Sequence, residues 1–380
     1  MAERIGGRLV LDDDVVSGRL VVEDGRIAAI EADRAGPGGR APDGAPQDGP
    51  VVMPGFIDVH VHGWGGHDAM GGTAALDGMA RALARRGVTS FLPTAVTASL
   101  ERLAGFADGV RAWMSGAPGD GAEPLGFNLE GPFLAEARKG AHPAALLRDP
   151  ADVSEAELAP LLDGLRVITI APERPGALEL IRQLAGRGVR ISLGHSAADV
   201  AEARAGFAAG AVTTTHLFNA MVGLHHRDPG LALQALLDDE VWVELIADGI
   251  HVDPGLWPLI WRLKPAERLL LVSDAIFLAG TDQRRGRLGE LEVEFDGHRV
   301  TLVGSDALAG SVSALDLEVR NLVEAGASLP AAALAASANP ATLLGLADRG
   351  RLAVGLRADL VELDGSLAVR RVMRGGDWIA

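Results

Sequence analysis

The sequence predicts an α/β fold, namely a (β/α)₈ TIM-like barrel with a small β-sandwich domain formed from both chain termini. Strand-like apolar runs alternate with amphipathic helical stretches through the middle of the chain, and short β-like segments occupy both ends. The 380 residues exceed the roughly 150 residues typical of one domain, so one large and one small domain are expected.

The barrel is predicted over residues 54–346. Its strand-like runs are 56–62, 89–95, 125–130, 166–171, 190–195, 212–217, 242–247 and 268–273, and helical patterns lie between them at 74–86, 99–114, 177–187, 199–208 and 231–238. Ser196 to Asp199 resembles a helix N-cap followed by an acidic third residue. Eight such units match a closed parallel barrel. A doubly wound open sheet is the alternative, but no G-x-G-x-x-G follows the first strand to support it.

The small domain is predicted from residues 1–53 and 347–380. Near the amino terminus, two short strands flank a hairpin turn at Asp24–Gly25. Residues 35–50 are rich in glycine and proline and are expected to form a loop or linker. Short β segments return in the tail, at 351–352, 358–362 and 368–373. Strands at both ends of the chain suggest that the termini pair with one another.

Composition excludes several classes of protein. The chain has no cysteine, so it has no disulfide and no thiolate ligand or nucleophile. Its formal net charge of −16 argues against a nucleic-acid or anionic-membrane surface, since both demand excess Lys and Arg. Neither a signal peptide nor a run of about 20 apolar residues is visible, so we expect no membrane partner and a cytoplasmic location.

Metal-type side chains close the predicted barrel strands. His60 and His62 end the first strand, and residues two apart on a strand face the same side. Strands three, five, six and eight are closed by Glu130, His195, His216 and Asp274. Each alone could be a satisfied structural residue, but catalytic residues of barrel enzymes come from these strand ends. Together they predict a metal site at the mouth of the barrel.

This donor set suits hydrolytic chemistry. Imidazole and carboxylate groups suit zinc, iron, manganese or cobalt, and such an ion acidifies a bound water and polarises a carbonyl. Hydrolysis also needs a group that takes a proton from water and passes it to the leaving nitrogen, and Asp274 is the candidate. The alternative is that Asp274 is a ligand to a second metal, and both roles could hold at once.

Further polar residues suit a phosphorylated, hydroxyl-rich ligand. They are His142, Asn219 with Ala220, Arg227 and His251, the last in the string Asp248-Gly-Ile-His. Arginine and backbone N–H groups are good phosphate partners. From spacing alone, Arg227 could equally be a solvated surface charge. His225 and His226 are expected on a surface loop, and His67 and His298 are expected to be structural.

Several strings together resemble the amidohydrolase superfamily, and within it the deacetylases of amino-sugar phosphates. They are PGFIDVHVHG at 54–63, NLEGPF at 128–133, KGAH at 139–142, LGHS at 193–196, THLFNAM at 215–221, RDPGL at 227–231, ADGIH at 247–251, VSDA at 272–275 and LAGS at 308–311. The resemblance implies that Glu130, His195 and His216 hold the principal metal and that Asp274 is the catalytic acid and base. It also implies a substrate-binding set of Ala141, His142, Asn219, Ala220, Arg227, Asp248, His251, Leu308, Ala309 and Gly310.

The resemblance implies hydrolysis of N-acetyl-D-glucosamine 6-phosphate to D-glucosamine 6-phosphate and acetate. Because His60 and His62 are present, one or two divalent ions are expected per subunit, with zinc favoured. A homodimer is implied, with the Arg227 region near the neighbouring subunit's site. The alternatives are a related N-acyl amino sugar such as N-acetylgalactosamine 6-phosphate and an inactive sugar-phosphate-binding barrel, although no ligand or acid residue has been lost.

Overall fold

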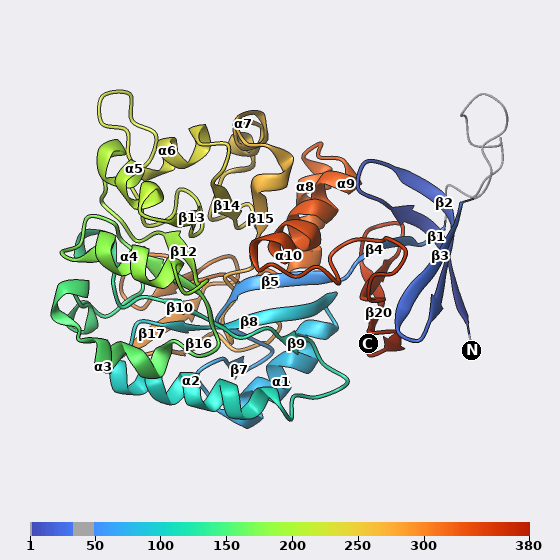
Figure 1. Cartoon of the computed structure of the whole chain (residues 1–380), viewed down its shortest axis with the longest axis horizontal. Helices are drawn as coiled ribbons and strands as arrows, with labels where there is room; N and C mark the ends of the chain where they lie inside the picture. Colours follow the sequence, from blue (N-terminus) through green and yellow to red (C-terminus); the bar gives the residue numbers. More distant parts are fainter. Residues whose placement is uncertain (1, 33–48) are drawn as a thin grey trace.

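Eight parallel strands form the centre of this computed structural model, which describes residues 2–32 and 49–380. In spatial order they are β5 (Phe56–Val61), β8 (Val88–Val96), β10 (Phe127–Glu130), β11 (Leu165–Ile170), β12 (Arg190–Leu193), β13 (Ala211–Thr214), β14 (Trp242–Leu245) and β15 (Leu269–Leu271). The two ends of this series meet just beyond β15, where the Asp274 N–H donates to the His60 carbonyl (2.9 Å) and the His62 N–H to the Ala275 carbonyl (2.8 Å). The predicted barrel is therefore confirmed (Figure 1).

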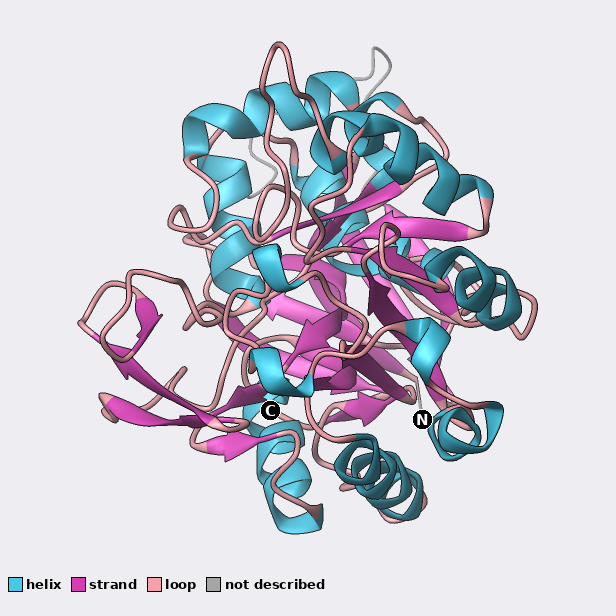
Figure 2. Ribbon diagram, turned by 90° about the vertical axis from the view of Figure 1, so that its left-hand side faces the viewer, coloured by secondary structure: helices cyan, strands magenta, loops and turns pink. Residues whose placement is uncertain are grey.

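Helices surround the central strands (Figure 2). They are α1 (Thr73–Ala84), α2 (Leu100–Met114), α3 (Glu155–Leu158), α4 (Ala177–Ala185), α5 (Val200–Ala208), α6 (Leu231–Leu237), α7 (Trp257–Leu263), α8 (Leu315–Glu324), α9 (Leu329–Ala333) and α10 (Asn339–Leu343). Because helices cover the outer face and side chains fill the interior, every residue of β5 and β8 is buried. Buried parallel strands favour apolar residues on both faces, and apolar residues predominate in these two strands. In the described residues, no helix is long and apolar enough to span a bilayer.

The two termini meet in one seven-stranded sheet. It comprises β1 (Glu3–Val10), β2 (Val15–Glu23), β3 (Arg26–Ala32), β4 (Val51–Pro54), β19 (Leu360–Leu363), β20 (Val369–Arg374) and β21 (Asp377–Trp378), with β4 paired between β1 and β19. Asp24 and Gly25 take positive φ angles of 50° and 76°, as the tight β2–β3 hairpin requires. The boundary at 53/54 falls inside β4 and the boundary at 346/347 falls shortly after α10, and as limits of separate folding units they stay a prediction.

Three local features differ from the sequence prediction or were absent from it. The N-cap of α5 is Asp199 with Glu202 as its partner, while Ser196 donates to Glu173 instead. Residues 351–352 form no strand, although Leu352 packs its side chain into the apolar cluster of the terminal sheet. A three-stranded antiparallel sheet, β16 (Arg285–Leu288), β17 (Leu291–Phe295) and β18 (Val300–Leu302), was not predicted. Most of the predicted loop at 35–50 lies outside the described residues.

Candidate metal centre and substrate pocket

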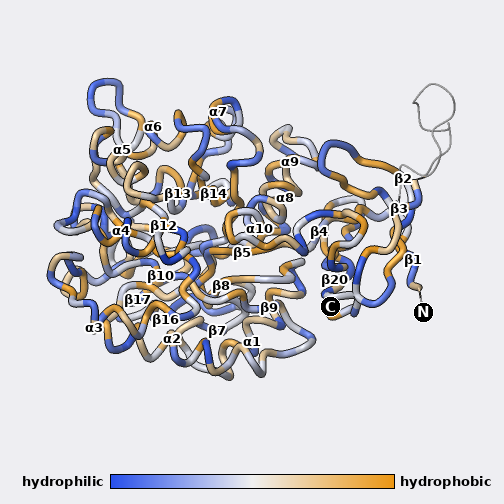
Figure 3. The backbone as a smooth tube through the Cα atoms, in the orientation of Figure 1, coloured by the Kyte–Doolittle hydropathy of each residue, from blue (hydrophilic) through white to orange (hydrophobic). Residues whose placement is uncertain are grey.

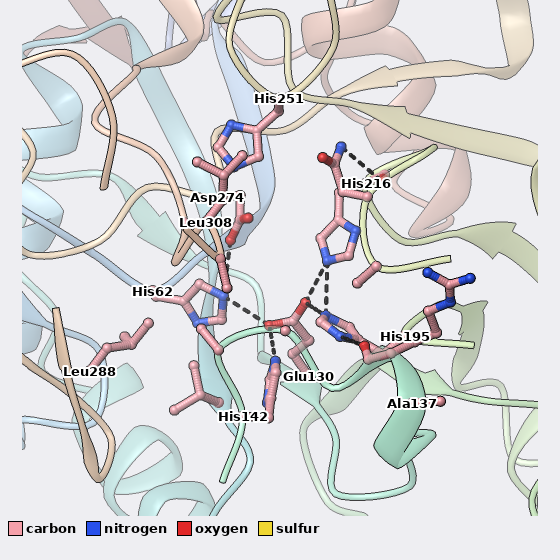
Figure 4. A pocket seen from close by; sticks show the side chains of 18 residues that line it. His62, Glu130, Ala137, His142, His195, His216, His251, Asp274, Leu288 and Leu308 are labelled. Carbon is pink, nitrogen blue, oxygen red and sulfur yellow. Dashed lines mark hydrogen bonds and ion pairs between the residues drawn. The ribbon is translucent and has the colours of Figure 1, made fainter. Parts of the chain in front are cut away.

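Three candidate site residues take an unusual backbone conformation at the ends of their strands. His195, His216 and Asp274 have φ angles of 47°, 28° and 46°, in the left-handed region that residues with a side chain rarely adopt. Each such residue costs on the order of 1–3 kcal/mol, and such strain is concentrated at functional sites. The fold accepts this cost at three of the places where a titratable side chain enters the mouth of the barrel (Figure 4).

The six strand-end residues form two adjacent groups. Glu130, His195 and His216 offer donor atoms that all lie within 4.8 Å of one another, and so do His60, His62 and Asp274. In the first group, Glu130 Oε1 lies 2.9 Å from His195 Nε2 and 2.8 Å from His216 Nε2. In the second, His62 Nε2 lies 3.2 Å from Asp274 Oδ1. Glu130 Oε2 joins the groups, because it lies 3.3 Å from His62 Nε2.

The other nitrogen of most of these rings is already occupied. His195 Nδ1 donates to the Arg138 carbonyl (2.9 Å), and His62 Nδ1 donates to the Thr94 carbonyl (3.1 Å). A carbonyl can only accept, so the Nδ1 atoms carry the hydrogens, and in the neutral rings the Nε2 lone pairs face the centre of the site. Lone pairs and carboxylate oxygens that converge in this way fit a divalent cation.

His142 has the opposite arrangement. The Thr97 N–H donates to its Nδ1 (3.2 Å), so the neutral ring carries its hydrogen on Nε2, 3.2 Å from Glu130 Oε2. Burial lowers the pKa of His142 to about 4, because loss of hydration and the neighbouring His195 outweigh the attraction of Glu130. His142 is therefore a hydrogen-bond donor at the edge of the centre and not a fourth equivalent ligand.

The electrostatics of the site favour a positive charge. Burial disfavours the charged form of His62, yet hydrogen bonds to Asp274 and Glu130 raise its pKa to about 9. Burial would raise the pKa of Asp274, but the hydrogen bond from His62 and the charge of His60 lower it to about 2. For Glu130 burial also opposes ionisation, and the surrounding histidines, led by His195, nevertheless hold its pKa well below the ordinary range. The centre therefore contains ionised carboxylates at neutral pH and attracts a cation.

A cavity of about 350 Å³ opens above this centre, a size that suits a small ligand. Of the predicted substrate residues, those that line it are Ala141, His142, Asn219, Ala220, His251, Leu308 and Gly310. Asp248 lies behind His251 and accepts from its Nδ1 at 2.8 Å. Ala309 is fully buried in an apolar cluster beneath the cavity.

Arg227 lies apart from the cavity within its own chain. It is exposed in the loop between β13 and α6, and its guanidinium contacts the His226 ring at 2.7 Å. This loop projects from the barrel in Figure 1 and is hydrophilic in Figure 3. His225 and His226 are exposed there as expected. Of the two histidines expected to be structural, His67 is half-buried, whereas His298 is exposed between β17 and β18.

Some residues of the site were not predicted from the sequence. Arg138 and Leu288 line the cavity, the second from the unpredicted β16. Glu244 lies within β14, fully buried, with one carboxylate oxygen 3.1 Å from His60 Nδ1. A single glutamate among the apolar residues of a strand does not stand out, and only the three-dimensional contact with His60 identifies it.

Comparison with known proteins agrees with this geometry. The model of the Amidohydrolase family matches residues 51–379. The chain is 41% identical over 362 residues to the N-acetylgalactosamine-6-phosphate deacetylase of Escherichia coli O157:H7, covering 93% of this chain and 92% of that one. It is 39% identical over 398 residues to the N-acetylglucosamine-6-phosphate deacetylase of Bos taurus, covering 98% of this chain and 93% of that one.

A solved structure is similar as well. It is a mutant N-acetyl-D-glucosamine-6-phosphate deacetylase from Mycobacterium smegmatis in complex with N-acetyl-D-glucosamine-6-phosphate, with a TM-score of 0.90, 34% identity and coverage of 100% of this chain and 99% of that one. Because the family model matches most of the chain and the identities exceed 30% over nearly its whole length, the chain belongs to the amidohydrolase family.

Proposed function

We propose that the chain hydrolyses N-acetyl-D-glucosamine 6-phosphate to D-glucosamine 6-phosphate and acetate. One observation carries the proposal: an ionised carboxylate, Asp274, and a neutral N–H donor, His142, line the same cavity as converging imidazole and carboxylate groups that fit a cation. Amide hydrolysis needs these three functions together. The substrate follows from the relatives, whose names specify amino-sugar phosphates.

Glu130, His195 and His216 would hold the principal divalent ion, and His60 and His62 with Asp274 offer a second position. We favour zinc, because imidazole nitrogens and a carboxylate oxygen are the ligands of many catalytic zinc sites. A bound ion supplies an acidified water and Lewis-acid polarisation of the acyl oxygen. All other functions can be assigned to side chains of the protein.

Asp274 is the proton carrier of the proposed reaction. Its low pKa leaves the carboxylate free to accept a proton from the water that attacks the acetyl carbonyl. Asp274 then returns that proton to the sugar nitrogen as the C–N bond breaks, so the amine leaves in neutral form. His142 donates its Nε2 hydrogen to the acyl oxygen, where negative charge develops as the water attacks.

The sugar phosphate is proposed to contact further residues that line the cavity. Asn219, Ala220 and His251 are among these residues, and Asp248 fixes the ring of His251 through a hydrogen bond to Nδ1. With Nδ1 occupied, Nε2 of His251 is the atom free to meet a hydroxyl or phosphate oxygen. Ala141 and the segment 308–310 would enclose the remainder of the sugar.

The decisive test is Asp274→Asn. We expect the purified variant to keep the ion at Glu130, His195 and His216, measured by elemental analysis, and to lose at least about 10³-fold in kcat, because asparagine cannot accept the proton. Near-wild-type turnover by a correctly folded variant would contradict the proposed proton transfer.

N-Acetylgalactosamine 6-phosphate is the second candidate substrate, because the relative from Escherichia coli O157:H7 named for that sugar is 41% identical to this chain. The two sugars differ only in the configuration at one carbon, which residue types alone do not distinguish. Comparison of kcat/KM for both phosphorylated sugars and their unphosphorylated forms would decide between them. Equal values with and without phosphate would contradict the proposed phosphate site.

We further propose that the protein acts as a homodimer in the cytoplasm and that Arg227 reaches the phosphate bound by its partner. The proposal is supported by the exposure of Arg227 on a projecting loop, away from its own cavity. In Arg227→Ala, KM for the phosphorylated sugar should rise about 10-fold or more, with little change for the unphosphorylated sugar. Unchanged KM, or a monomer with full activity in sedimentation and kinetic assays, would contradict this assignment.

A further inference from the structure

Glu244 is a buried carboxylate that contacts both donor groups of the metal centre. It lies on β14, is 0% exposed, and points its side chain into the barrel beneath the mouth. One oxygen, Oε2, accepts a hydrogen bond from His60 Nδ1 (3.1 Å) and another from the backbone N–H of His216 (3.1 Å). His60 belongs to one donor group and His216 to the other.

The contact with His60 determines which ring nitrogen can bind an ion. A carboxylate oxygen that already accepts from a backbone N–H has no hydrogen to give, so Nδ1 of His60 carries the hydrogen. Nε2 of His60 is then the lone-pair nitrogen, and it lies 3.2 Å from His62 Nε2 and 3.7 Å from Asp274 Oδ1. A carboxylate behind an imidazole also makes the metal-facing nitrogen more basic.

The contact with His216 holds the turn that follows β13. The Leu217 N–H donates to the Glu244 backbone carbonyl at 2.8 Å, so both the side chain and the main chain of Glu244 bind this turn. His216 has the strained φ angle of 28°, and its Nδ1 has no hydrogen-bond partner within residues 2–32 and 49–380. With no hydrogen bond at Nδ1 among the described residues, the ring of His216 is positioned through its backbone, whose N–H donates to Glu244.

We propose that Glu244 is a positioning residue that holds His60 and His216 in their ion-binding orientations, and that the His60–His62–Asp274 position loses its ion when Glu244 is removed. This inference rests on the proposed metal centre. Glu244 lies outside the donor set and maintains the second position, and its Oε2 contacts one residue of each position.

A matched control exists elsewhere in the barrel. Glu318 of α8 is also 0% exposed, also has one carboxylate oxygen without a partner in the described chain, and accepts from a backbone N–H, that of Ala247 at 3.3 Å. Ala247 is not a donor in either group. A change at Glu318 therefore reproduces the loss of a buried glutamate side chain without removing a hydrogen bond to His60 or His216.

The experiment titrates metal-free protein with Zn²⁺ against a competing chelator, for the wild type and for Glu244→Gln, Glu244→Leu, Glu318→Gln and Glu318→Leu. We expect two classes of site in the wild type. In Glu244→Gln, whose amide oxygen can still accept a hydrogen bond, the dissociation constant of the weaker site should rise about 10-fold, and in Glu244→Leu about 100-fold. The Glu318 variants should leave both constants within about twofold.

Three outcomes would overturn the inference: a wild type that binds one ion, a Glu244→Leu variant with two unchanged constants, or Glu318 variants that weaken binding as much as their Glu244 counterparts. If Glu244→Leu fails to fold by circular dichroism, Glu244→Gln decides, and a change below twofold counts against the inference. Deacetylation is assayed separately. A wild type that binds two ions without activity would refute the proposed function alone, and an active single-ion wild type would refute only the role of Glu244.

Discussion

Two regions of this molecule contain clusters of buried or partly buried charge, and the charges of the two clusters are neutralised differently. Where the barrel meets the terminal sheet, each carboxylate of the junction cluster has a guanidinium partner from the same chain. Arg349 Nη1 lies 3.0 Å from Glu123 Oε2, Arg357 Nε lies 3.0 Å from Asp359 Oδ1, and Arg357 also pairs with Glu123. At the barrel mouth, by contrast, the carboxylate of Glu130 faces only imidazole rings.

The difference separates a structural cluster from a functional one. In the junction cluster the positive partners are permanently charged, so the charges are balanced without a ligand. The imidazoles at the mouth become positive only by taking up protons. The raised pKa of His62 shows that the neighbouring carboxylates favour its protonated form. A buried charge that the chain itself does not neutralise indicates a place where an external ion binds.

Removal of metal should have the largest effect of the tests that follow from this comparison. After dialysis against a strong chelator, we expect deacetylase activity to fall by at least about 10³-fold and to return when Zn²⁺ is added. The thermal midpoint should fall as well, because an ion that binds only the folded state contributes about 4 kcal/mol at a thousand times its dissociation constant. Full activity in protein shown by elemental analysis to be metal-free would contradict the distinction between the two clusters.

His142→Leu should have a smaller effect. Leucine has no hydrogen-bond donor to replace the Nε2–H that the Thr97 contact fixes in place, so we expect kcat to fall about 10²-fold, as for loss of one oxyanion donor. Metal content should stay the same, because His142 presents a hydrogen and not a lone pair to the centre. His298→Leu, on an exposed histidine, is the control and should be neutral. Loss of metal from His142→Leu would show that His142 is a ligand.

The strand ends could be predicted from sequence, and the reason is physical. A polar residue such as Glu130 or His195 that closes an apolar run interrupts a pattern, and eight repeated units predict where such interruptions meet. Glu244 could not be recognised in this way, because it lies inside its strand between apolar neighbours, as an ordinary outward-facing residue would. Its inward direction depends on barrel closure, which no local pattern encodes.

Two other parts of the site lay beyond sequence reasoning. The sheet that brings Leu288 to the cavity has short, mostly part-exposed strands with little periodicity. The opposite tautomers of His142 and His195 depend on whether a backbone N–H or a backbone carbonyl lies behind the ring. That distinction arises from tertiary contacts between residues far apart in the chain.

The smallest expected effect concerns the junction cluster. Glu123→Gln leaves the guanidinium groups of Arg349 and Arg357 without one of their partners, and Glu123 is a third exposed, so we expect a loss of about 2 kcal/mol in the free energy of unfolding. Activity per folded molecule should not change, because this cluster lies outside the cavity. Urea unfolding and kcat of the purified variant would check both parts, with the exposed Glu31→Gln as the control.

The pH dependence of the unfolding free energy of Glu123→Gln distinguishes a loss of charge pairing from a loss of packing. Burial alone would raise the pKa of Glu123, but Arg349 and Arg357 lower it below its ordinary value of 4.5. A carboxylate with a lowered folded-state pKa stabilises the protein above the unfolded-state pKa, and this contribution is lost as the pH falls through the folded-state pKa. The stability difference between wild type and Glu123→Gln should therefore be largest near neutral pH and shrink below about pH 4.5. A difference that stayed constant into acid would show that the guanidinium partners do not stabilise the Glu123 carboxylate, and the contrast between the two clusters would lose its electrostatic basis.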